Sequence, residues 1–345
     1  MITQISSNKD KFSKKIAKKI AIITDGSFKM GLGHVYRTIA LAKELSDFGK
    51  VIFYTQSENV VVDKIKSNGY KVFKVNNNDE LKEQLDFEKP NAIIIDKLEV
   101  DENFARDIKN GLNAKLIIFG NLSSANKYAD VVINAIIGTN YKNKTYLDKN
   151  TNTLYLEGPK YLVLRREFYE HKNSYKFRNN LENILLIFGG SDQANLTTRI
   201  LDKLLSMNHN FKIDIILGSA FKFDKELLKL FKKYKNIENR VHIYRNVNNV
   251  SELMTKTDLV FTSAGTAMFE SFLIGLPTIT FYQNLLQKRM FEGFITTYDL
   301  NKINNFENFI FGVYKNYYEN KKEIDKLDIG GGRNEIITNI IGGKK

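Results

Sequence analysis

A chain of 345 residues, 43% of them hydrophobic, is too long for one compact core and long enough for two domains. It contains no cysteine, and no two of its four histidines have metal-ligand spacing, so we expect no disulfide, no metal and no other cofactor. The net charge of +13 comes mostly from scattered lysines, which argues against nucleic-acid binding and is compatible with a diphosphate site or a loose attraction to an anionic membrane surface.

Residues 1–17 form a polar, lysine-rich extension. They lack the apolar core of a signal peptide, and no apolar block in the sequence reaches the roughly 18–20 residues that a membrane span needs. We therefore expect a cytoplasmic protein.

The first half of the chain alternates short apolar blocks with amphipathic segments, which is typical of parallel strands joined by covering helices. The pattern predicts strands over residues 18–24, 51–55, 71–75, 92–96, 116–120 and 131–134, and helices over 33–48, 59–68 and 79–85. Residues 142–152 are polar and without a strand or helix period, which indicates a loop, and 161–163 are predicted as a further strand.

A second series of the same kind follows the polar stretch 171–180, where we place the linker between domains. The predicted strands are 183–188, 212–217, 241–244, 259–262 and 278–282, and the predicted helices are 193–207, 225–234, 250–255, 266–274, 287–296 and 306–322. The sequence thus predicts an α/β protein with an N-terminal Rossmann-like domain over 18–170 and a C-terminal one over 181–345, whose last helix can return to the N-terminal domain.

The first candidate site is a glycine-rich turn between the first strand and its helix. Asp25, Gly31 and Gly33 belong to the turn, and His34 and Arg37 open the helix. Glycines let the backbone approach a ligand, and a helix N-terminus offers N–H groups to an anion. His34 suits general acid–base catalysis because imidazole titrates near neutrality, although a capping or packing histidine is the other interpretation. Arg37 could face an anion or form a surface ion pair.

The second candidate site is the turn formed by Gly189, Gly190 and Ser191, again between a strand and a helix. A diphosphate could rest on this turn. The alternative is an ordinary tight turn in which Ser191 or Asp192 caps the helix.

The third candidate site contains Ser263, Gly265 and Thr266 at the start of a helix, with Glu270 one turn later. A carboxylate at that place can accept two hydrogen bonds from a ribose diol. The alternative is an acidic side chain stabilised by the helix dipole, an effect of about 0.3–1 kcal/mol.

Five segments carry a resemblance: GLGHVYR at 31–37, EGPKYLVLRREF at 157–168, IFGGSD at 187–192, SAGTAMFESFLIGLP at 263–277 and DIGGGRNEII at 328–337. In this order they resemble the UDP-sugar hydrolase family of pseudaminic acid biosynthesis and its spore-coat polysaccharide relatives. That family is related to the glycosyltransferases of the GT-B fold.

The resemblance implies two Rossmann-like domains facing each other across a cleft, with UDP mainly on the C-terminal domain and no metal. It implies that Glu270 holds the ribose, that the Gly265 and 189–191 turns hold the diphosphate, and that His34 is the catalytic base that activates water. Ser263 and Thr266 complete the expected nucleotide site. The expected substrate-binding residues are Asp25, Gly31, Gly33, Arg37, Asp96 and Gln287.

Three positions that lie near the sugar in that family differ here. Asp96 is followed by Lys97 instead of an aromatic residue, residues 120–122 replace a pair of aspartates, and Leu286 stands before Gln287 where the family has asparagine. Three functions therefore stay open. The protein could hydrolyse a UDP-linked amino-deoxy sugar in surface-glycan or nonulosonic acid biosynthesis, transfer that sugar to a glycan or lipid acceptor, or bind a UDP-sugar without catalysis. The expected partner is the UDP-sugar, and the protein would be a monomer or an oligomer of undefined size.

Overall fold

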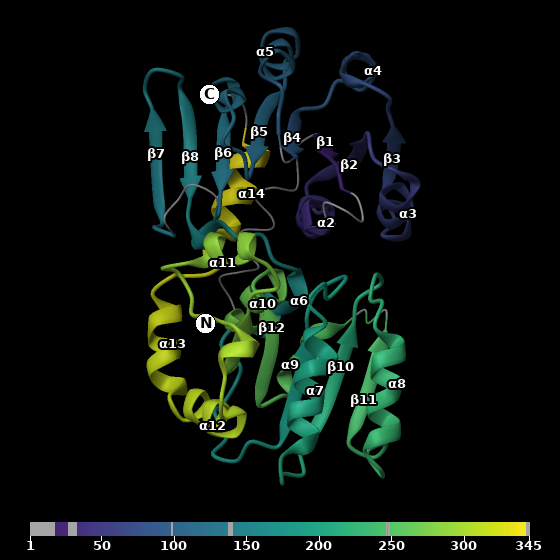
Figure 1. Cartoon of the computed structure of the whole chain (residues 1–345). Coiled ribbons are helices and arrows are strands. Elements are labelled where there is room, and N and C mark those ends of the chain that lie inside the picture. Colours follow the sequence, from purple (N-terminus) through teal and green to yellow (C-terminus); the bar gives the residue numbers. More distant parts are fainter. Residues whose placement is uncertain are drawn as a thin grey trace. The chain divides into compact units, whose positions relative to one another are not determined.

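The computed structural model describes residues 18–26, 33–97, 99–136, 141–245, 247 and 249–342. They form two compact units (Figure 1). The first unit holds the described residues up to Asn134, Lys144–Glu157 and those from Arg333 onward. The second holds those of Ala135–Asn143 and Gly158–Gly332. The linker that we expected at 171–180 lies inside the second unit, where Asn173 N donates to Leu273 O at 2.9 Å.

The first unit is built on an eight-stranded sheet. Its strands are β1 (Lys18–Thr24), β2 (Gly49–Thr55), β3 (Lys71–Lys74), β4 (Ala92–Asp96), β5 (Lys115–Phe119), β6 (Val131–Asn134), β7 (Lys144–Asp148) and β8 (Thr153–Glu157). Their order is β3-β2-β1-β4-β5-β6-β8-β7, and every described neighbour pair is parallel except β7 with β8. The strand order reverses between β1 and β4, where Thr24 lies beside Asp96.

The helices of the first unit cover a core rich in isoleucine. They are α2 (Gly33–Leu45), α3 (Asn59–Ser67), α4 (Asn78–Glu88), α5 (Glu102–Gly111), α14 (Arg333–Ile341) and the 3₁₀ helix η1 (Ser124–Tyr128). β4 is buried at every position, as expected for a parallel strand with both faces covered. Ile93 and Ile95 pack in one cluster with the apolar residues of α4 and α5.

The second unit is built on a six-stranded parallel sheet. Its strands are β9 (Asn183–Ile187), β10 (Lys212–Leu217), β11 (Val241–Arg245), β12 (Leu259–Ser263), β13 (Thr278–Phe281) and β14 (Thr297–Tyr298). The order is β11-β10-β9-β12-β13-β14, so the connections reverse direction between β9 and β12.

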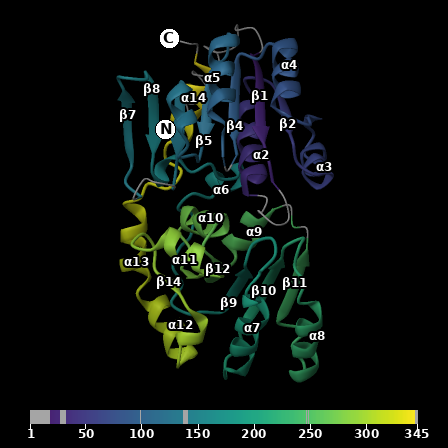
Figure 2. The same cartoon turned by 45° about the horizontal axis from the view of Figure 1, so that its top comes forward.

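Helices cover both faces of the second sheet. They are α6 (Arg166–Glu170), α7 (Leu196–Ser206), α8 (Asp224–Lys233), α9 (Val250–Thr255), α10 (Thr266–Ile274), α11 (Leu285–Phe291), α12 (Phe306–Lys315), α13 (Tyr317–Asp325) and the 3₁₀ helices η2 (Pro159–Tyr161) and η3 (Leu300–Lys302). Along β9, Ile184 and Leu186 pack in one cluster with α7, α8 and α12, whereas Leu185 and Ile187 pack in another with α9 and α10. Both views show α7 and α8 beside β10 and β11 (Figures 1 and 2).

Some sequence-based predictions of local structure are wrong. Residues 142–152, predicted as a loop, contain β7, and the strand predicted at 161–163 is absent because the chain there leaves η2 in extended but unpaired form. The single helix predicted at 306–322 is two helices that meet at Asn316. β7 lacks an apolar alternation because all its residues are exposed or half-exposed. In the described part of the chain, no helix has both the length and the apolar character to cross a bilayer.

Candidate active site

Three side chains of the first unit meet where the strand order reverses. Ligands of open parallel sheets bind at the carboxyl ends of strands at such a point. Asp96 ends β4 and is fully buried, while His34 and Arg37 lie one turn apart at the start of α2. His34 Nδ1 lies 2.6 Å from Asp96 Oδ1, and Arg37 donates from Nε to Oδ2 at 2.7 Å and from a terminal nitrogen to Oδ1 at 2.5 Å.

The charges in this cluster fix how His34 is protonated. Burial by itself would raise the pKa of Asp96, but the Arg37 guanidinium and the hydrogen bonds from His34 and Arg37 outweigh burial and hold that pKa below its ordinary value. An ionised carboxylate only accepts hydrogen bonds, so Nδ1 of His34 carries the proton toward Asp96. Nε2 then has the lone pair, and it has no hydrogen-bond partner among the described residues. The side chain is 26% exposed. This is the arrangement of a general base oriented by a carboxylate.

Gly120, just after β5, makes room for the Arg37 side chain. Its φ of +57° is in the left-handed region, and a Cβ there would lie 3.0 Å from a terminal nitrogen of Arg37. The neighbouring Asn121 is buried, and its N–H donates to Asn134 Oδ1 at 3.0 Å. Sequence reasoning marked residues 120–122 only as a departure from the family. Contact with Arg37 shows that Gly120 supports the His34 cluster.

Asp25 makes its described contacts within the first unit. Its Oδ1 accepts from Thr55 Oγ1, Gln56 N and Ser57 Oγ at 2.8–3.1 Å, and its Oδ2 lies 2.8 Å from Lys97 Nζ. Burial would raise the pKa of Asp25, but Lys97 and these hydrogen bonds lower it. Asp25 thus joins the ends of β1 and β2. Of the two expected glycines, Gly33 is exposed at the start of α2, and Gly31 lies outside the described residues.

In the second unit, the 189–191 turn follows β9 at the reversal of the strand order. Gly189 has φ +77°, and Gly190 is exposed. Gly218, after β10, packs so closely that a Cβ there would lie 2.3 Å from the carbonyl oxygens of both glycines. Sequence reasoning missed Gly218, although a glycine directly after a strand is a signal for such an approach.

The helix that follows this turn already has an anionic partner. Asp192 accepts hydrogen bonds from Leu196 N at 2.8 Å and from Thr197 N at 2.9 Å. Its carboxylate therefore occupies the first N–H groups of α7, as in the capping alternative. A diphosphate on this turn would contact the exposed glycine backbone rather than the end of α7.

The turn after β12 leaves its helix uncapped. Gly265 precedes α10, and no side chain caps the helix. The N–H groups of Gly265, Thr266 and Ala267 donate to no described residue, and Thr266 is exposed. Ser263 is buried at the end of β12. The uncapped amides and the partial positive charge of a helix N-terminus favour an anion here.

Glu270 is paired with Arg165 inside the second unit. Arg165 donates from Nε to Oε1 at 2.7 Å and from a terminal nitrogen to Oε2 at 2.8 Å, and Glu270 is 1% exposed. Burial raises the pKa of Glu270 more than Arg165 lowers it. Sequence reasoning quoted the segment that contains Arg165 without giving it a role. A ribose bound at Glu270 would have to share the carboxylate with Arg165 or displace it.

Gln287 also has a partner close by in the chain. Its Oε1 accepts from Gln283 N at 2.8 Å, and its own N–H donates to Asn284 Oδ1 at 2.9 Å, so Asn284 caps α11. Gln283 Nε2 donates to Phe188 O at 3.0 Å, which links the end of β13 to the 189–191 turn. Leu285 and Leu286 are exposed beside these amides.

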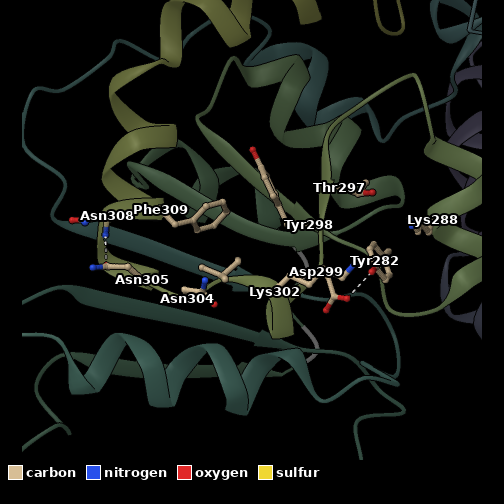
Figure 3. Close-up of a pocket in the computed structure, with 11 residues that line it drawn as sticks. Tyr282, Lys288, Thr297, Tyr298, Asp299, Lys302, Asn304, Asn305, Asn308 and Phe309 are labelled. Carbon is tan, nitrogen blue, oxygen red and sulfur yellow. Dashed lines mark hydrogen bonds between the residues drawn. The ribbon is translucent and has the colours of Figure 1, made fainter.

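A pocket of about 640 Å³ opens beside β14 (Figure 3). The Tyr282 hydroxyl donates to Asp299 Oδ2 at 2.8 Å along its wall, and Lys288 and Lys302 also line it. None of the residues predicted from the sequence lines this pocket. Among the residues that the structure describes, no group of three or more histidine, cysteine, aspartate or glutamate side chains is placed to hold a metal.

Comparisons with known proteins agree with this layout. The glycosyltransferase family 28 C-terminal domain matches residues 184–284, which contain both glycine turns and Glu270. The solved structure of MurG from Acinetobacter baumannii matches with a TM-score of 0.60 and 12% identity, over 94% of this chain and 99% of MurG. At that identity the likeness shows the fold alone. The predicted fold class, two Rossmann-like domains of the GT-B type, is confirmed.

Three relatives are similar in sequence. The spore coat polysaccharide biosynthesis protein SpsG of Bacillus subtilis is 26% identical, over 76% of this chain and 77% of SpsG. The UDP-2,4-diacetamido-2,4,6-trideoxy-beta-L-altropyranose hydrolase of Campylobacter jejuni is 22% identical, over 74% of this chain and 88% of the hydrolase. The uncharacterized protein MJ1062 of Methanocaldococcus jannaschii is 43% identical over 336 residues, which are 95% of this chain and 67% of MJ1062. With this identity and coverage, the chain belongs to the same protein family as MJ1062.

Proposed function

We propose that the protein is a nucleotide-sugar enzyme of glycan biosynthesis that hydrolyses a UDP-linked amino-deoxy sugar to the free sugar and UDP. The observation that carries this proposal is the His34 imidazole, whose Nδ1 is held by the buried Asp96 while Nε2 has no described partner. The names of the hydrolase and spore-coat relatives support the choice of substrate class.

In the proposed reaction, His34 Nε2 removes a proton from water. The water oxygen attacks the anomeric carbon, the bond from that carbon to the phosphate oxygen breaks, and UDP leaves with the electron pair. Asp96 stabilises the imidazolium that forms. Arg37 acts as a positioning residue, because its Nε and one terminal nitrogen hold both oxygens of Asp96.

The second unit would bind the nucleotide. The match to a family 28 C-terminal domain supports this role. We assign the diphosphate to the uncapped start of α10 and the exposed 189–191 turn, and the ribose to Glu270, with Arg165 close enough to contact the same ligand.

A second candidate is sugar transfer. The family 28 domain is described as part of a glycosyltransferase, which favours this reading. The same imidazole would then take the proton of an acceptor hydroxyl in place of water. Both reactions need His34 and differ in the nucleophile alone.

The test is UDP release from a panel of UDP-sugars by purified protein, with and without candidate acceptors. Release at an enzymatic rate without an acceptor supports hydrolysis, and release only with an acceptor supports transfer. Binding of UDP with no turnover of any sugar would overturn both and leave a binding protein.

The base is tested with His34→Gln, which should slow UDP release by about 10²–10⁴-fold. The matched control is His242→Gln, because His242 Nδ1 also lies near an aspartate, 3.1 Å from Asp214, but on an exposed edge strand. The control should keep its activity within about twofold. Equal activity of the two variants would show that His34 is not the base.

A further inference from the structure

β7 is an edge strand with both faces open. It is the last strand of the first sheet, antiparallel to β8 (Figure 1). Its first four residues are exposed, and the exposed fractions of Tyr146 and Leu147 are 44% and 52%. Unpaired edges with apolar side chains tend to pair with another strand, and proteins usually block them with charge or cover.

The other edge of the same sheet is blocked in this way. β3 has the sequence KVFK, with Lys71 and Lys74 at its two ends. If two copies of β3 paired antiparallel about a twofold axis, Lys71 of each copy would face Lys74 of the other. Like charges directly opposite each other are destabilising, so this edge resists self-pairing.

The sequence of β7 has the opposite property. In KTYLD, twofold antiparallel pairing centred on Tyr146 places Lys144 opposite Asp148 of the second copy, twice. Side chains directly opposite share a face, so these charges flank the two Tyr146 rings on one face, while Thr145 and Leu147 meet on the other. Lys144 forms no ion pair with a described residue.

A second strand would also extend an aromatic arrangement that exists already. Tyr146 lies opposite Tyr155 of β8, with ring centroids 5.0 Å apart and planes within 6°. A second copy of Tyr146 on the same face would continue this row across the new edge. Pairing would cover Tyr146 and Leu147, the two largest exposed apolar side chains of the strand.

We infer that two copies of this chain associate through β7, antiparallel and centred on Tyr146, so that their first sheets become one continuous sheet. Five residues per strand bury less than the roughly 1,200 Å² of a stable interface, so the dimer is weak and depends on protein concentration. This inference does not depend on the proposed function.

Sedimentation velocity over a range of protein concentrations tests it. Wild type should pass from monomer to dimer as the concentration rises. Lys144→Asp and Asp148→Lys each place like charges opposite each other twice, and each should weaken the dimer by about tenfold or more. The double variant with both changes exchanges the two charges and should restore the dimer. The control, Lys229→Asp on α8, has the same charge change as Lys144→Asp and should leave it unchanged.

A cysteine scan tests the register separately, because the natural chain contains no cysteine. Tyr146→Cys places two thiols directly opposite, about 4.5–5.5 Å apart at Cβ, and added copper–phenanthroline should join them. Leu147→Cys places them diagonally, about 7–8 Å apart, and should react more slowly. A wild type that stays monomeric at all concentrations, or a dimer that ignores the charge exchange, overturns the inference. UDP release by the charge variants should equal that of wild type, which separates this result from the enzymatic one.

Discussion

At the scale of single residues, the burial of a carboxylate distinguishes one histidine from the others. His34, His209 and His242 each lie within 3.1 Å of an acidic side chain. The partner of His209, Glu307, is 48% exposed, and the partner of His242, Asp214, is 27% exposed, whereas Asp96 is 0% exposed. Water screens the exposed pairs and weakens them. Only a buried carboxylate with a buried arginine can hold an imidazole in one tautomer and one orientation.

Asp96→Asn keeps the shape of the side chain and removes its charge. We expect UDP release to fall by about 10²–10⁴-fold, because His34 loses the partner that fixes its tautomer. Arg37 would be left without a counter-charge, which costs about 3–5 kcal/mol of unfolding free energy at neutral pH. Urea unfolding and the UDP-release assay measure the two effects.

The stability effect of Asp96→Asn has a defined pH dependence. The folded-state pKa of Asp96 lies below the ordinary value of 3.8, so its contribution is present above that pH and is lost as the pH falls through the folded pKa. The difference between variant and wild type should therefore narrow only below about pH 3.8. A difference that narrows between pH 8 and 5 would contradict the assignment.

At the scale of elements, two helices that follow glycine turns differ in what their first N–H groups contact. Asp192 occupies those of α7, whereas no side chain caps α10. A helix N-terminus attracts an anion only while its amides lack another acceptor. The two turns looked alike in the sequence, and this difference makes α10 the better candidate for the diphosphate.

Gly265→Ala tests the role of α10. The backbone at Gly265 is extended, and a Cβ there would have its nearest neighbour at 4.0 Å, so stability should change by less than about 0.5 kcal/mol. The methyl group would meet a phosphate on the helix amides, and UDP affinity in calorimetry should fall by about tenfold or more.

Gly189→Ala is the contrasting variant. Its φ of +77° is unfavourable for alanine, so about 1–2 kcal/mol of stability should be lost even without ligand. Unchanged UDP affinity in Gly265→Ala would place the diphosphate elsewhere.

At the scale of the whole molecule, the chain path joins its two ends in one unit. α14 comes from the end of the described chain and belongs to the first unit, where Arg333 pairs with Glu44 and the backbone oxygen of Ile341 accepts from Lys18. Ile336 and Ile340 are each 1% exposed. The stability of the first unit therefore depends on residues that follow the second unit in sequence.

Ile340→Ala should lower the unfolding free energy of the first unit by about 2–5 kcal/mol, because it leaves a cavity in a buried position. Calorimetry should show one transition moving to lower temperature, while UDP binding by the second unit persists. The control is Thr338→Ala, an exposed position of the same helix. Loss of UDP binding together with the transition would show that the two units unfold as one.

The sequence by itself determined most strands and the fold class, because strands buried on both faces are continuous apolar blocks and each is followed by a recognisable helix. β7 could not be predicted on this basis, since a strand exposed on both faces has no apolar pattern. The glycine turns were also readable, because a turn between a strand and a helix is a local feature.

Only the tertiary structure decided what the polar side chains of these turns contact. Asp96 and His34 are 62 residues apart in the chain, and Arg165 and Glu270 are 105 apart. Each pair meets because packing sets strand register and helix position, as where Thr24 of β1 lies beside Asp96 of β4. Such long-range register depends on the whole core, so local spacing can name a base or a ribose ligand but not the partner that orients or occupies it.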